Sequence, residues 1–214
     1  MADKDQQPLY FWRETDPTTG WLSQWYYCPF RDDEDESIVY DTAEHYMMYQ
    51  KALLFNDALV AARVLTAAQH PRAIKALGRK VAGFNEETWA AHREDIVRRG
   101  NVLKFTRAVS ELPTGGEGGG GGGGATGGDG SKKNDKKKRT AAGKRDALEG
   151  SNGSTLKEIL LATGEREIVE ASPYDAIWGI GFTERDAEGM RDHWGLNLLG
   201  KALMEVRDEL REHE

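Results

Sequence analysis

The stretch DTAEHYMMYQKALL, residues 41–54, carries the strongest helix signal in the chain. Asp41 can act as the N-cap, and Glu44 three residues later can reach back to it, which is the capping-box pattern of a helix start. We therefore predict a helix from Asp41 to about Leu54. Glu44 and Lys51 share one face of this helix and lie ~10 Å apart along its axis. That separation is too long for an ion pair, but it suits two groups that flank a ligand.

Both residues also have simpler interpretations, which the sequence leaves open. Glu44 can serve only to cap its own helix. Lys51 can be an ordinary exposed lysine on a solvated face. The two interpretations of Glu44 do not exclude each other, because a capping residue can also line a site.

Outward from this helix, the sequence predicts more helices and little sheet. Aromatic residues mixed with Asp, Gly and Pro in residues 9–39 indicate short strands and turns. A regular apolar stripe predicts a final helix over residues 197–209. The other expected elements are helices at 57–68, 71–79, 86–110 (with Gly100 as a candidate break) and 155–162, a strand at 167–171 and a loop at 172–194. The predicted fold class is mainly α, an α+β fold with a minor β element.

Residues 113–153 differ sharply in composition from the rest of the chain. They include seven consecutive glycines, residues 118–124, and then a Lys-rich tract. Such a segment has little apolar surface to bury against the entropy of ordering it, so we expect a long disordered insertion. Neither flank looks self-sufficient, and loop closure costs grow slowly with length. Residues 1–112 and 154–214 are therefore expected to be two parts of one compact domain.

The composition argues against several classes of protein. A net charge of -7 disfavours a general nucleic-acid-binding surface, because phosphates would be repelled. No apolar run approaches the roughly 20 residues of a membrane-spanning helix, and the N-terminus does not resemble a signal peptide. Cys28 is the only cysteine and the histidines are scattered, so we expect neither a disulfide nor a metal centre. We expect a cytoplasmic protein, or a nuclear one if the basic run at 136–139 is an import signal.

A second candidate motif is the Gly-rich stretch EASPYDAIWGIG, residues 170–181. Asp175 precedes Trp178 by three residues, and Gly179 and Gly181 follow. An indole offers a flat face for a heterocyclic base, and glycines let backbone amides approach a phosphate or sugar. The alternative is a turn anchored by a buried tryptophan, because an isolated Gly-x-Gly is a weak signal.

Four blocks together resemble the NADAR/YbiA-like family. They are GWLSQW (residues 20–25), TAEHYMMYQKA (42–52), VEASPYDAIWGIG (169–181) and NLLGKALM (197–204). The resemblance implies a mainly α-helical YbiA-like domain that hydrolyses N-glycosidic bonds. Its implied substrates are phosphorylated ribosylamino-pyrimidine intermediates of riboflavin synthesis, or ADP-ribose attached to guanine. The implied catalytic residues are Glu44, Asp175 and Lys51, and the implied substrate-binding residues are Trp178, Gly179, Gly181, Trp25 and Asn197.

The expected mechanism follows from the charge that develops when a C1′–N bond breaks. A carboxylate near C1′ and O4′ stabilises the positive ribose ring, and a second acid orients water or protonates the departing nitrogen. We assign the first role to Glu44, the second to Asp175 and base stacking to Trp178. Lys51 can bind phosphate or form a transient imine with a ring-opened ribose. Such hydrolysis requires no metal or redox cofactor.

Two alternatives come from other functional classes. The same pocket can belong to a catalytically inactive module that binds ADP-ribose or a related nucleotide. The functional part can instead be the basic insertion, in a structural or interaction protein. For the enzyme, the expected partner is a small phosphorylated ribosyl substrate, with nucleic acid entering only as an ADP-ribosylated substrate and no membrane involved. The sequence leaves the oligomeric state open.

Overall fold

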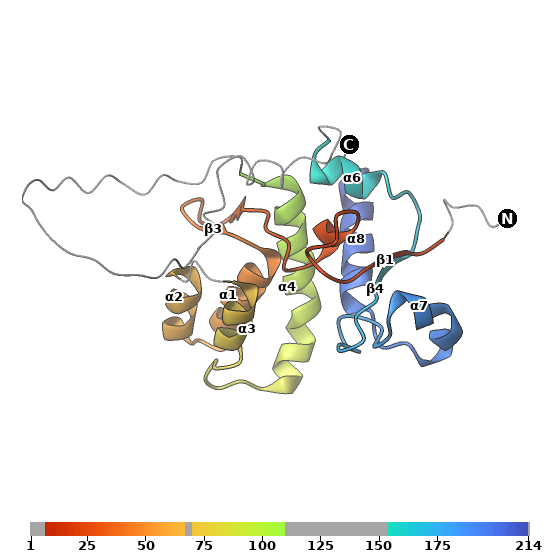
Figure 1. Cartoon of the computed structure of the whole chain (residues 1–214). Coiled ribbons are helices and arrows are strands. Elements are labelled where there is room, and N and C mark those ends of the chain that lie inside the picture. The colour runs from red at the N-terminus through yellow and green to blue at the C-terminus, as the bar shows by residue number, and fades with distance from the viewer. Residues whose placement is uncertain (1–6, 67–69, 110–153, 214) are drawn as a thin grey trace, which may run out of the picture.

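The computed structural model describes residues 7–66, 70–109 and 154–213 (Figure 1). Helices dominate these residues and the strands are very short, which confirms the mainly α fold with a minor β element. The predicted insertion at 113–153, with its basic run, lies outside the described residues. The α-helices are α1 (Ala43–Leu54), α2 (Ala58–Thr66), α3 (Pro71–Gly78), α4 (Glu86–Thr106), α6 (Leu156–Leu161), α7 (Glu184–Ala187) and α8 (Leu198–Glu212). The shorter elements are β1 (Leu9–Phe11), β2 (Phe30–Arg31), β3 (Val39–Tyr40), β4 (Ile168–Glu170) and the 3-10 helices η2 (Gly20–Leu22) and η3 (Glu188–His193).

Helix α4 stands at the centre, with α1 packed against it on one side and α8 on the other (Figure 1). It begins where predicted, because the Asn85 side chain accepts a hydrogen bond from the Thr88 N–H at 2.8 Å. The predicted break at Gly100 is wrong, since α4 is continuous from Glu86 to Thr106. A Cβ at position 100 would lie 2.6 Å from the Tyr46 ring of α1. The glycine therefore permits the close approach of two helices.

A parallel strand pair joins the N-terminal segment to the part of the chain that follows residue 153. In β1 and β4, Leu9 lies opposite Ile168 and Phe11 opposite Glu170. The main hydrophobic core also mixes both parts, because Met47 of α1 and Leu203 of α8 belong to one buried cluster. We infer from this shared core that residues 1–112 and 154–214 are parts of one domain.

The start of α1 differs from the prediction by one residue. The N-cap is Thr42, whose hydroxyl accepts a hydrogen bond from the His45 N–H at 3.2 Å, and not Asp41. Glu44 is thus the second helical residue, where it cannot complete a capping box with Asp41. His45 takes that place instead, because its Nδ1 accepts the Asp41 N–H at 3.2 Å. The carboxylate of Glu44 is left for other contacts.

The C-terminal part follows the prediction except in one loop. The capping box at Thr155 and Glu158 is present, and the apolar stripe of α8 is buried. The predicted loop at 172–194 contains α7 and η3, which are too short and too charged to show helical periodicity. None of the helices in the described ranges is both long and apolar enough to cross a membrane.

Candidate active site

Glu44 lies in the first turn of α1 with only 5% of its surface exposed. Its backbone N–H donates to the Gln24 carbonyl at 3.0 Å, and the Trp25 side chain donates a hydrogen bond to its carboxylate. The Oε1 atom is buried without a hydrogen-bond partner among the described residues. A buried carboxylate oxygen that lacks a partner is costly for folding, which favours a functional role.

The loop that covers Glu44 is held by a buried lysine of α4. Lys104 has 0% exposure, and its amine donates to the carbonyls of Trp21 at 2.6 Å and Ser23 at 3.1 Å. Burial lowers the pKa of Lys104 to about 8. These two bonds fix the backbone on the N-terminal side of Gln24 and Trp25. The side-chain amide of Gln24 is also buried, and neither of its polar atoms has a partner among the described residues.

Asp175 lies in the loop after β4, where its carboxylate anchors a turn. Its Oδ1 accepts the backbone N–H groups of Ile177 at 3.0 Å and Trp178 at 2.8 Å. The Leu199 N–H donates to the Trp178 carbonyl at 3.0 Å, which ties this loop to the start of α8. The turn interpretation from the sequence is therefore present, and it also fixes the orientation of the carboxylate. No hydrogen bond to Asp175 Oδ2 is found within the described ranges.

Glu170, the last residue of β4, is an acid that the sequence analysis did not select. Its N–H donates to Asn197 Oδ1 at 3.0 Å and its carbonyl accepts the Ile180 N–H at 2.9 Å, so its backbone is fixed on both sides. Its Oε2 is buried without a partner in the described part of the chain. The sequence feature that could have identified Glu170 is its position as a carboxylate at the end of an apolar strand. Burial, then the charge of Asp175, raises the pKa of Glu170 to about 8, while Lys75 opposes the shift.

These acids influence one another although they come from distant parts of the sequence. Burial raises the pKa of Glu44, and the negative charge of Asp175 raises it further. Lys75 and Arg79 act in the opposite direction, as does the hydrogen bond from Trp25. The structure thus places Glu44 and Asp175, which were predicted from separate motifs, within one local electric field. Glu170 belongs to the same group.

A row of cations on α3 faces this acidic group, and the sequence analysis missed it. Arg72, Lys75 and Arg79 are three and four residues apart, which places them on one side of the helix and its C-cap. Arg72 lies over the Trp25 ring, with its Cζ 6.0 Å from the ring centroid. Lys75 acts on both Glu44 and Glu170. These cations can balance the acids or bind the phosphate of a ligand.

Lys51 is not an ordinary exposed lysine. Its amine lies 4.1 Å from the ring centroid of Phe84 and 5.2 Å from that of Trp89. Partial burial lowers the pKa of Lys51, and Glu86 and Glu44 oppose the shift. The charge of Glu44 is therefore felt at Lys51, as expected for two groups on one helix face.

The remaining predicted site residues shape the loop around Asp175. Trp178 is half-buried and packs against the main core. A Cβ at Gly179 would lie 2.6 Å from the Glu170 carbonyl oxygen, and Gly181 has a φ of +78° that favours glycine. The buried Asn197 uses both amide atoms on β4, accepting from Glu170 and donating to the Ile168 carbonyl at 3.0 Å. Its contacts are those of a positioning residue.

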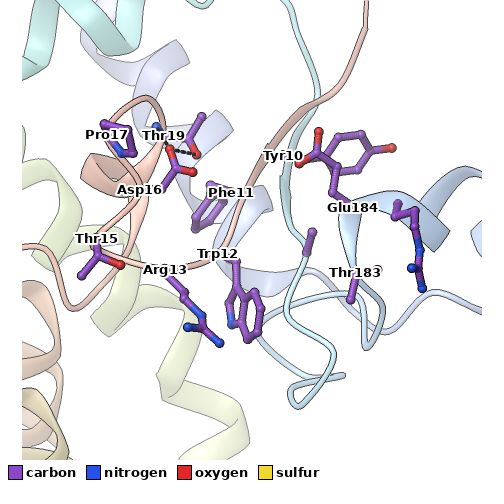
Figure 2. A pocket seen from close by; sticks show the side chains of 12 residues that line it. Tyr10, Phe11, Trp12, Arg13, Thr15, Asp16, Pro17, Thr19, Thr183 and Glu184 are labelled. Atoms are coloured by element: carbon purple, nitrogen blue, oxygen red, sulfur yellow. Dashed lines mark hydrogen bonds between the residues drawn. The ribbon is translucent and has the colours of Figure 1, made fainter.

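A cleft of about 530 Å³ lies next to this group, but the acids do not line it. Trp12 and Arg13 extend side by side from the segment after β1, and Thr183 and Glu184 form the opposite wall (Figure 2). Side chains alternate along a strand, so Glu170 lies on the Ile168 side of β4, which faces the main core, and Glu170 does not line this cleft. We place the candidate active site at the acids, because the cleft holds no comparable buried carboxylate.

Within the described residues, no set of three or more His, Cys, Asp or Glu side chains converges on a metal position. The candidate site comprises three carboxylates, the cations of α3, Lys51 and the Trp25 indole. Two of the carboxylates, Glu44 and Glu170, have raised pKa values, and such groups beside cations can exchange protons and stabilise positive charge, as glycoside hydrolysis requires.

Comparison with known proteins agrees with this chemistry. Residues 10–211 match the model of the NADAR domain. A protein of Acanthamoeba polyphaga mimivirus named as an N-glycosidase is 36% identical over 192 residues, covering 88% of this chain and 86% of that protein. A riboflavin biosynthesis protein of Vibrio vulnificus is 26% identical, covering 97% of this chain but 40% of its own length. The solution structure of Escherichia coli YbiA superposes with a TM-score of 0.58 at 22% identity, covering 97% of this chain and 87% of that one, and so shares the fold. The predicted family is thereby confirmed, and the chain belongs to the NADAR domain family.

Proposed function

We propose that this protein is an N-glycosidase that hydrolyses the bond between ribose and a heterocyclic base. The observation that carries the proposal is the buried carboxylate of Glu44, which lies beneath Trp25 with one oxygen unpartnered and in the field of Asp175. The N-glycosidase name of the mimivirus relative, which matches along most of both chains, supports the same class of reaction.

In this proposal Glu44 stabilises the positive charge that develops on the ribose ring. Burial raises the pKa of Glu44, so the empty site disfavours its anion. A developing cation beside the carboxylate relieves that penalty, and the relief is greatest in the transition state. The turn fixes the orientation of the Asp175 carboxylate through Oδ1, and its second oxygen can orient the attacking water.

The cations supply binding for a phosphorylated sugar. Lys75 and Arg79 face the carboxylates from α3, where they can contact a phosphate. Lys51 can join them, or its lowered pKa can favour the neutral amine that attacks a ring-opened ribose to form an imine. Half-buried Trp25 and Trp178 can stack on the base.

Two substrate classes fit this site. A ribosylaminopyrimidine phosphate needs only the acids and the α3 cations, and the name of the Vibrio vulnificus relative points to riboflavin synthesis. ADP-ribose on guanine is longer and would need additional contacts. The exposed ring of Tyr174, next to Asp175, pairs with Trp12 at a centroid distance of 6.0 Å, and Trp12 leads into the adjacent cleft. This aromatic pair favours the longer substrate as a second candidate.

The first experiment measures release of free base by chromatography. Purified full-length protein is incubated with ribosylaminopyrimidine phosphate and, separately, with ADP-ribosylated guanosine. We expect release from one of them, reduced at least 100-fold in Glu44→Gln, with Glu205→Gln on the exposed face of α8 as the matched control. Full turnover by a folded Glu44→Gln would refute the assignment of Glu44. Saturable binding without release by the unmodified protein would favour the inactive nucleotide-binding module.

A further inference from the structure

We propose that Glu170 is a further catalytic residue, the general acid that protonates the base nitrogen as it departs. This inference rests on the proposed N-glycosidase function and changes which acid donates the proton in it. From its motif, Asp175 could either orient water or protonate the departing nitrogen. The geometry points to Glu170 as the proton donor, which leaves Asp175 to orient water.

The backbone of Glu170 is fixed as a catalytic group requires. Asn197 accepts its N–H, the Ile180 N–H donates to its carbonyl, and β1 pairs alongside. Alternation along β4 directs the side chain toward the main core, on the same face as Ile168. Its Oε2 is buried and meets no hydrogen-bond partner among the described residues. A protonated carboxyl with a free donor direction is the form that can pass a proton to a bound base.

The surroundings of Glu170 favour its protonated form. Asp175 from the following loop and Glu44 from α1 face it with negative charge, and Lys75 from α3 is the cation that opposes them. Like charges at close range cannot all ionise, so one acid of such a group retains a proton. Asp175 is already committed as an acceptor of two N–H groups through Oδ1. With burial, these charges raise the pKa of Glu170 to about 8, so it holds its proton at neutral pH.

The proposed step balances without an oxidant, a reductant or a metal. The C1′–N bond breaks, and its electron pair stays on the nitrogen, which takes the proton from Glu170. The positive charge on the ribose ring is stabilised by Glu44. Water, oriented by Asp175, adds its oxygen to C1′ and gives one proton to solvent. Glu170 then takes a proton back from solvent, so the net change is addition of water across the C1′–N bond.

A leaving-group comparison tests this role. Glu170→Gln is assayed on the heterocyclic substrate and on a 4-nitrophenyl riboside with the same 5′ group. The control is Glu167→Gln, whose carboxylate precedes β4, alternates to the opposite side of the strand and pairs with Arg191. Nitrophenolate leaves without protonation. We expect Glu170→Gln to lose about 10²- to 10⁴-fold in kcat on the heterocyclic substrate and less than about tenfold on the nitrophenyl substrate. Glu44→Gln should lose both activities, because both reactions develop charge on ribose.

The pH profile on the heterocyclic substrate gives a second readout. The protonated form of Glu170 is the active one, so kcat of the unmodified protein should fall as pH rises through about 8. That fall should be absent from the residual activity of Glu170→Gln. Equal losses on both substrates, or an unchanged alkaline limb, would overturn the role of Glu170 while leaving the N-glycosidase proposal intact. If the unmodified protein releases no base at all, both proposals fail together.

Discussion

Replacing Trp25 with phenylalanine removes the one hydrogen bond that the Glu44 carboxylate accepts among the described residues. Phenylalanine retains an aromatic ring beside His70, whose ring centroid lies 6.1 Å from that of Trp25, but it has no N–H. The hydrogen bond stabilises the anion and lowers the pKa of Glu44 against the effect of burial. Removing it therefore favours the protonated form, which cannot stabilise a cationic ribose ring.

The magnitude follows from the strength of a hydrogen bond to a charged group, about 1.5–3 kcal/mol. Each 1.4 kcal/mol is about a factor of ten in rate, so kcat/KM at pH 7 should fall about 10- to 150-fold. The acid limb of the kcat/KM profile should move to higher pH, because Glu44 must be ionised to act. Activity should partly recover as pH rises past the displaced limb.

The assay is kcat/KM against pH for the unmodified protein and Trp25→Phe. Trp194→Phe is the matched control, since it also removes an indole hydrogen bond, to the Ala187 carbonyl at 2.8 Å, outside the candidate site. The control should show no displacement of the acid limb. A loss of activity in Trp25→Phe with the limb in its original place would refute the electrostatic reasoning and leave only a packing role.

Two further changes test the site and the fold. Lys51→Met should lower kcat/KM by at least about tenfold relative to the exposed control Lys201→Met. Lys51→Arg then separates the two roles of Lys51. If Lys51 binds phosphate, arginine should preserve kcat, whereas if Lys51 forms an imine, arginine should not replace it. Unchanged activity in Lys51→Met would exclude both roles. Gly100→Ala should lower the free energy of unfolding by about 1 kcal/mol, because crowding against Tyr46 exceeds the gain in helix propensity. The control is Gly189→Ala, whose new Cβ meets no atom within 4 Å. Equal melting temperatures for Gly100→Ala and the unmodified protein would contradict the close α1–α4 contact.

The helices could be predicted from the sequence because their signals are local. The side chains of Asn85 and Thr155 cap helices through neighbours three residues away, and the apolar repeat of α8 lies within one segment. The β1–β4 pair gives no such signal. Each strand has three residues, and more than 150 residues separate them along the chain. Their pairing depends on the shared core, which no local pattern describes.

The candidate site likewise contains residues that could be predicted from local sequence and residues that could not. Glu44 and Asp175 could be selected because each lies in a motif with a recognisable local pattern. Glu170 and Lys75 could not, because their roles depend on burial and on charges brought from other elements. The resemblance implied that Asn197 binds substrate, and only the tertiary structure shows that its amide contacts the backbone of β4. Chemistry-bearing residue types can be found locally, but their protonation states depend on the tertiary structure.

The one-residue difference at the start of α1 has a consequence for Glu44. Asp41 and Thr42 are both favourable N-caps, so propensity alone does not choose between them. With Thr42 as the cap, the N–H of Glu44 meets the Gln24 carbonyl and its carboxylate meets Trp25. His45, and not Glu44, then satisfies the backbone ahead of the helix. Glu44 is therefore buried without contributing a cap to its own helix.

This placement predicts opposite effects of Glu44→Gln on stability and activity. An acid whose pKa is raised by folding binds its proton more tightly in the folded state, so stability is lost as pH rises above its ordinary pKa of 4.5. At pH 7 the neutral amide removes that penalty, and the melting temperature should stay level or rise while base release is lost. At pH 4, where the unmodified side chain is also largely protonated, the two proteins should melt at similar temperatures. A melting temperature several degrees lower at pH 7 would instead show that Glu44 serves the fold.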